Sequence, residues 1–220
     1  PPSEVLRKQP DDHVLQQLKV NYNYNNWQSS GLIKGYQTLH TIDGPKLTEP
    51  YRILPGITLS NNNFAEYNFS DSLNFPMGLN LGMDSHAMYF ARPLHPNPDK
   101  SFDGQRYYIK PTASLPVKQS YGYITPKIAV NARYYSLNQL TDSAKLRGYN
   151  KSQDYVIPIY SVDSGLFFDR KFEFNNTNYN QTLEPRLFYL YVPSKNQYHA
   201  PNFDIKTNTL TYSQLFRDNY

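Results

Sequence analysis

The clearest alternation of apolar and polar side chains lies toward the end of the chain, in residues 179–193, YNQTLEPRLFYLYVP. One set of alternate positions carries Tyr179, Leu183 and Tyr191, and the pattern predicts a β-strand rich in aromatic residues. Strands of soluble proteins commonly end after about 5–6 residues, whereas a tilted crossing of a bilayer takes roughly 9–11. The length therefore favours a membrane-spanning strand. Pro185 is its one irregularity, because proline cannot donate to a strand ladder.

The same two-faced pattern recurs along the chain and predicts about eight strands. In residues 106–117, for example, Ile109 and Leu115 alternate with Lys110 and Thr112. The predicted strands are residues 13–25, 27–42, 51–60 with a continuation through 64–69, 75–91, 106–117, 121–135, 154–170 and 179–193. Short turns alternate with long polar or proline-rich loops between them. Outer-membrane barrels show this alternation, with short periplasmic turns and long extracellular loops.

We therefore predict an all-β fold, an antiparallel transmembrane β-barrel segment that supplies about eight strands of a larger barrel. In residues 51–60 the alternation places Tyr51, Ile53, Ile57 and Leu59 on one apolar face. Tyrosines near the ends of such faces are expected to form the aromatic girdle of the membrane interface. They are Tyr51, Tyr107, Tyr134 and Tyr191.

Composition agrees with a barrel and argues against other classes. Charged residues make up only 18% of the chain, yet no run approaches the roughly 18 apolar residues of a spanning helix. The net charge of +4 is spread along the chain, so it predicts no nucleic-acid-binding patch. The chain has no cysteine, which excludes a disulfide or a thiolate metal site within it. Both ends look cut from a longer chain, so a missing signal peptide carries no information about export.

Catalytic and metal sites find little support in the sequence. The histidines show no ligand spacing, so we predict no metal site, no cofactor and no enzyme activity; they are His13, His40, His86, His95 and His199. No serine stands in a G-x-S-x-G turn. Asp84 and His86 share one face of a predicted strand, which leaves an outer-membrane hydrolase as one interpretation. Two ordinary polar groups that line the inside of a barrel are the other.

One family resembles this chain at several places. Residues 181–193, QTLEPRLFYLYVP, resemble the signature of the LPS-assembly outer-membrane protein family, LptD (OstA). Further similar stretches occur in the family's order; they are YIKPTASLPV at 108–117, VIPIYSVDSGLFFDR at 156–170 and QLFRDN at 214–219. Together they cover most of residues 51–220.

The resemblance implies a very large barrel that carries lipopolysaccharide to the outer leaflet of the outer membrane of a Gram-negative bacterium. It also implies an LptE-type lipoprotein plug in the lumen and a periplasmic transport bridge that delivers lipid to a jellyroll domain. The jellyroll, the family's cysteines and the barrel-closing strands are absent from this sequence. Residues 1–220 are therefore expected to be the central part of the outer-membrane β-barrel domain. A general outer-membrane porin or receptor and a secreted carbohydrate-binding β-sandwich are the alternatives.

Charged residues on the polar faces of the predicted strands are the candidate site. In this family they would contact the plug or the phosphate groups of the lipid, which arginine can bind in bidentate fashion. Alternatively, they form an ion-pair network that keeps charge away from lipid, where each charge costs roughly 2–4 kcal/mol at mid-depth. These residues are Lys110, Lys127, Arg133, Glu184 and Arg186.

Overall fold

The structure, a computed structural model, describes residues 13–38, 50–69, 76–92, 103–138, 140, 142, 145, 148–175 and 177–204. The elements with bounds in these residues are β-strands: β1 (His13–Tyr24), β2 (Trp27–Thr38), β3 (Arg52–Asn68), β4 (Gly78–Ala91), β5 (Gly104–Ser114), β6 (Val117–Gln119), β7 (Gly122–Leu137), β8 (Ser152–Leu166), β9 (Phe168–Phe174), β10 (Thr177–Leu183) and β11 (Arg186–Tyr191). In this part of the chain, no helix has the length and apolar character needed to cross a membrane.

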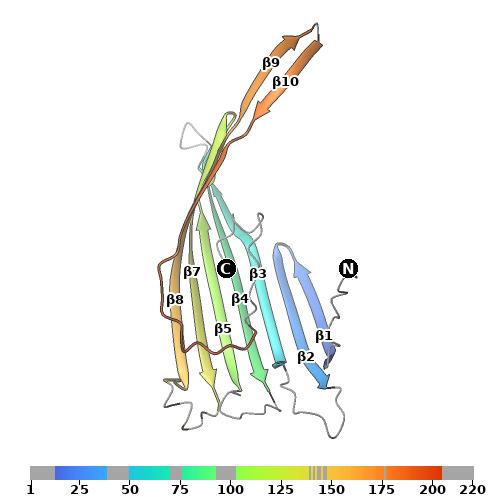
Figure 1. Ribbon diagram of the computed structural model, residues 1–220, viewed down its shortest axis with the longest axis vertical. Helices are drawn as coiled ribbons and strands as arrows, with labels where there is room; N and C mark the ends of the chain where they lie inside the picture. Colours follow the sequence, from blue (N-terminus) through green and yellow to red (C-terminus); the bar gives the residue numbers. More distant parts are fainter. Residues whose placement is uncertain are drawn as a thin grey trace, which may run out of the picture.

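The strands form one antiparallel sheet in the order β1-β2-β3-β4-β5-β7-β8-β11, with the short β6 paired to β7. Strands β9 and β10 form a separate two-stranded hairpin that projects beyond the sheet (Figure 1). The predicted all-β, antiparallel architecture is confirmed. The described strands make a single layer and a projecting hairpin, which does not match the two facing sheets of the β-sandwich alternative.

Burial alternates along the central strands because successive side chains of a strand point to opposite faces. On β5, Ile109 is 43% exposed and Lys110 is 9% exposed. Val156 of β8 is 54% exposed, whereas Asn131 of β7 is 3% exposed. We call the side with Ile109 and Val156 the outer face, and the side with Lys110 and Asn131 the covered face. The outer face is apolar and the covered face carries the polar residues, as the alternation predicted.

Strand β3 departs from the prediction. Its pairing with β4 shifts between Ile53 and Gly56, and an irregularity of this kind changes which face the following residues occupy. Tyr51 and Ile53 are therefore buried, both 7% exposed, whereas Ile57 is 58% exposed. The prediction that these three residues share one face was wrong, and Tyr51 lies in the core instead of an aromatic girdle. Strand β3 then continues as a single strand to Asn68, with a second shift between Asn61 and Ala65.

The stretch of residues 179–193 is two strands and not one. Strand β10 pairs with β9, and β11 pairs with β8, with Glu184 and Pro185 between them. Proline lacks the N–H that a ladder requires, and the carbonyl of Pro185 instead accepts a bond from the backbone N–H of Leu166 at 3.1 Å. The predicted strand of residues 154–170 is likewise divided into β8 and β9, at Phe167.

After β11 the chain leaves the sheet. It runs down beside β8 and then across the lower part of the sheet (Figure 1). We call residues 192–204 the crossing segment. Its Phe203 joins the hydrophobic core on the covered face, at the sheet end where long connections join β2 to β3, β4 to β5 and β7 to β8. The other core residues are Tyr51, Ile53, Phe90, Tyr135, Leu137 and Tyr155.

Candidate functional site

Polar side chains on the covered face lie in rows that run across the strands. The pairing registers place one residue each of β3, β4, β5, β7 and β8 opposite the next, and the first such row is Thr58, His86, Tyr108, Arg133 and Tyr155. The adjacent row includes Ser60, Asp84, Lys110, Asn131 and Ile157. These rows form a polar, cation-rich surface next to the apolar core.

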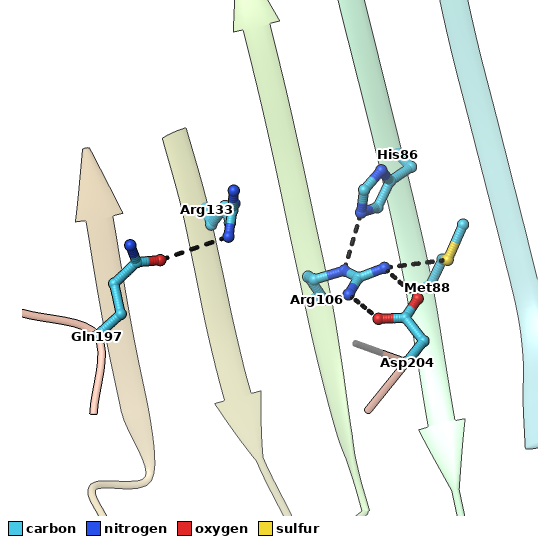
Figure 2. Close-up of polar contacts among 6 residues, drawn as sticks. All are labelled: His86, Met88, Arg106, Arg133, Gln197 and Asp204. Carbon is cyan, nitrogen blue, oxygen red and sulfur yellow. Dashed lines mark hydrogen bonds and ion pairs between the residues drawn. The ribbon is translucent and has the colours of Figure 1, made fainter. Parts of the chain in front are cut away.

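Arg106 of β5 is the centre of the polar contacts on this face (Figure 2). Its Nε donates to Nε2 of His86 at 2.9 Å, and its guanidinium lies over the ring of Phe90 at 4.9 Å. Its two terminal nitrogens form a bidentate ion pair with the carboxylate of Asp204, at 2.5 and 2.8 Å. Strands β4 and β5 therefore orient the guanidinium, and the crossing segment supplies the anion.

Arg133 of β7 has a similar arrangement. Its Nε donates to Oδ1 of Asn131 at 3.0 Å, and its Nη1 donates to Oε1 of Gln197 at 3.5 Å. Gln197 belongs to the crossing segment, as does Asp204 (Figure 2). Both arginines thus contact the sheet and also the crossing segment.

Three of the five predicted site residues lie together on the covered face of β5 and β7, and Arg186 shares that face from β11. Lys110 is buried and lies opposite Asp84 in the β4–β5 pairing, which is a favourable position for opposite charges. Lys127 lies opposite Ser114 and Ser161, several residues along the same face from Arg133. The alternation in the sequence therefore assigned these three cations correctly to the polar, covered face. Their role as lipid or plug contacts stays a prediction.

The other two predicted residues, Arg186 and Glu184, lie at or next to the break between β10 and β11. Arg186 forms a bidentate pair with Asp163 of β8, with Nε–Oδ1 and Nη2–Oδ2 distances of 2.8 and 2.6 Å. The hydroxyl of Tyr123 donates to the same carboxylate at 3.3 Å. Glu184 lies in the break between β10 and β11 and is exposed. Arg186 also borders a cavity of about 510 Å³, whose lining includes Pro185 and Leu187.

Asp84 and His86 do share a face, yet their contacts do not resemble a catalytic pair. The Nε2 atom of His86 accepts a bond from Arg106, and the imidazole stacks on Tyr108 at 4.7 Å. The nitrogen that a general base would present to a nucleophile is thus occupied by a cation. Within the described residues no three His, Cys, Asp or Glu side chains are placed to hold a metal ion. His40 and His95 lie outside these residues.

Sequence reasoning missed Arg106, Gln197 and Asp204. Arg106 is only the first residue of a predicted strand, and no strand is predicted after residue 193. Arg106 and Asp204 are 98 positions apart, and no periodicity connects a strand with a loop at that separation. Only the path of the chain after β11 brings them together.

Comparisons with known proteins agree on one family. The sequence profile described as "LptD: LPS transport system D" matches residues 6–220. The chain is 36% identical to the LPS-assembly protein LptD of Pseudomonas putida (strain GB-1), covering 99% of this chain and 26% of that protein. It is 32% identical to the protein of the same name from Hahella chejuensis, covering 98% and 25%. For the Coxiella burnetii protein the identity is 34%, covering 93% and 22%. The chain thus spans about a quarter of the length of the curated relatives it matches.

Proposed function

The chain belongs to the LptD family of LPS transport proteins, and we propose that it forms part of a barrel wall that assembles lipopolysaccharide into the outer leaflet of the outer membrane of a Gram-negative bacterium. In this proposal residues 1–220 are the central part of the barrel domain. The outer face contacts lipid and the covered face lines the lumen. The wall guides lipid passage and is not a catalyst.

The difference between the two faces is the observation that carries this proposal. Apolar side chains such as Ile57, Ile109 and Val156 are exposed on the outer face, where a soluble protein would avoid a large contiguous apolar surface. On strands β4, β5 and β7 the charged side chains all lie on the covered face; they are Asp84, Arg106, Lys110, Lys127 and Arg133. Charges turned away from lipid avoid a cost of roughly 2–4 kcal/mol each at mid-depth.

The cations of the covered face suit an anionic lipid that moves through the lumen. Lys110, Lys127 and Arg133 extend along this face, and we assign them contacts with phosphate groups of the lipid or with an LptE-type lipoprotein plug. Arg186 and Glu184 lie near the break between β10 and β11, close to the turns of the periplasmic end in the proposed orientation. We assign them contact with lipid as it arrives from the periplasmic transport bridge.

Photo-crosslinking in living cells tests this function in the full-length parent protein. The crosslinker p-benzoylphenylalanine replaces either Arg133 or Tyr134, which are neighbours in the sequence on opposite faces; Tyr134 is 45% exposed. Lipopolysaccharide is expected to crosslink at both positions while transport runs. When its supply is stopped, the adduct at position 133 should disappear and that at 134 should persist. Normal lipid assembly with no adduct at position 133 would contradict the proposal.

A further inference from the structure

The crossing segment covers Arg106 and Arg133 on the covered face with its own polar side chains. Asp204 pairs with Arg106, and Gln197 contacts Arg133 (Figure 2). The registers place Arg106 opposite Tyr135 and Arg133 opposite Tyr108, so the two arginines are diagonal neighbours on adjacent strands. Diagonal neighbours lie within reach of long side chains. One anionic group could therefore contact both arginines.

The guanidinium of Arg106 has three contacts that do not involve the crossing segment. His86 accepts the bond from Nε at 2.9 Å, the sulfur of Met88 lies 3.7 Å from Nη2, and the Phe90 ring lies beneath. All three partners come from β4, which is paired with β5 along its length. The edge formed by the two terminal nitrogens is the part that faces the crossing segment. That edge binds carboxylate and phosphate groups in the same bidentate geometry.

Asp204 is also the more accessible partner of the pair. Its side chain is 43% exposed, whereas that of Arg106 is 13% exposed. The carboxylate can therefore leave toward the lumen while the arginine stays in the wall. Strands β4, β5 and β7 would then present four cationic side chains against one carboxylate, that of Asp84; the cations are Arg106, Lys110, Lys127 and Arg133. Such a surface attracts anions.

We propose that Arg106 and Arg133 form a phosphate-binding site that the crossing segment occupies at rest, with Asp204 in the place of the phosphate. A phosphate group of the transported lipid displaces Asp204, and the crossing segment then moves off this part of the covered face. This inference rests on the proposed function, because it assigns a lumen site to the lipid. To that function it adds a phosphate-binding site, Asp204 as the occupant of the site at rest, and the exchange of Asp204 for a phosphate group of the lipid.

Titration of the purified full-length protein with inorganic pyrophosphate tests the exchange. In the Asp204→Asn variant the competing charge is removed, so the dissociation constant for pyrophosphate should fall about tenfold, which corresponds to roughly 1.4 kcal/mol. Adding Arg106→Gln to that variant should abolish the gain. Asp154→Asn, which removes an exposed carboxylate from the outer face, should leave the wild-type constant unchanged.

A spin label at position 198 provides a second readout, since Tyr198 lies in the crossing segment and is 84% exposed. Pyrophosphate should increase the mobility of this label in the otherwise wild-type protein, and Arg106→Gln should make the label mobile without ligand. Equal pyrophosphate affinity with and without Asp204, or a label that pyrophosphate does not mobilise, would overturn the proposed site. If the crosslink at position 133 still forms in cells, that failure concerns only the site and leaves the transport function intact.

Discussion

The Arg186–Asp163 pair illustrates at the residue scale how this wall holds its charges. Both hydrogen bonds are short, and the side chains are 45% and 28% exposed. Simple exposed ion pairs contribute little to stability, but bidentate arginine–carboxylate pairs are stronger and geometrically specific. Their positions on β11 and β8 also place the pair across a strand junction. We therefore expect it to fix the pairing of these two strands.

Charge reversal tests this expectation. Arg186→Asp and Asp163→Arg should each destabilise the full-length protein by about 1–2 kcal/mol, because each puts like charges side by side. The double reversal should recover most of the loss, measured as the urea midpoint in detergent. If the stability loss of the double variant equals the sum of the two single losses, the two residues have no coupling energy.

The crossing segment is the element that most changes the covered face. It enters the core through Phe203, which stacks on Phe90 with ring centroids 4.4 Å apart and meets Tyr51 edge-on at 5.0 Å. Phe203 is 6% exposed. The crossing segment forms no strand pairing within residues 192–204. Among the described residues, the end of the segment is therefore attached to the sheet mainly by these ring contacts and by the Asp204–Arg106 pair.

Removing the ring should detach the segment while the sheet stays folded. Phe203→Ala removes a buried ring, a change that typically costs 3–5 kcal/mol in a core. We expect the protease cleavage rate within residues 192–204 to rise roughly tenfold or more in the full-length protein, since local opening becomes easier.

Tyr198→Ala is the matched control, because it changes an aromatic residue of the same segment that is 84% exposed. Its cleavage rate should stay at the wild-type value. Similar rates for Phe203→Ala and the wild type would mean that the aromatic contact does not hold the segment in place.

An element could be predicted where the local sequence determines it, and could not where contacts with distant residues determine it. The faces of β5, β7 and β8 could be predicted because a strand alternates every residue, and Ile109, Lys110 and Asn131 follow that rule. In β3 the rule failed, because the register shift after Ile53 depends on pairing with β4 and leaves no mark in the alternation.

The candidate site could be predicted only in part. The face of Lys110, Lys127 and Arg133 follows from local alternation. The contacts of Arg106 with Asp204 and of Arg133 with Gln197 depend on a return of the chain 98 and 64 positions later. No local pattern encodes such a return.

At the scale of the whole molecule, the described sheet is open, with β1 and β11 at its edges. Most side chains of β1 are exposed, including Leu18 and Val20 at 62% each. Unpaired edge strands are not tolerated in lipid and promote aggregation in water. Further strands of the parent barrel are therefore expected to pair with these edges.

Residues 1–220 produced alone should accordingly fail to fold cooperatively. We expect aggregation in water and no sharp unfolding transition in detergent, followed by circular dichroism. The full-length parent, treated in the same way, should give a heat-resistant folded form. A soluble monomer of residues 1–220 with a cooperative transition would contradict the membrane-wall account.

Accessibility along β5 shows whether one face of this sheet meets lipid while the other lines a lumen. Single cysteines at residues 106–114 of the full-length protein in lipid bilayers would carry a spin label, read with an apolar relaxation agent. We expect high accessibility to that agent at Ile109 and Ala113 and low accessibility at Lys110 and Thr112. Uniformly low values along β5, or the reversed alternation, would contradict this expectation.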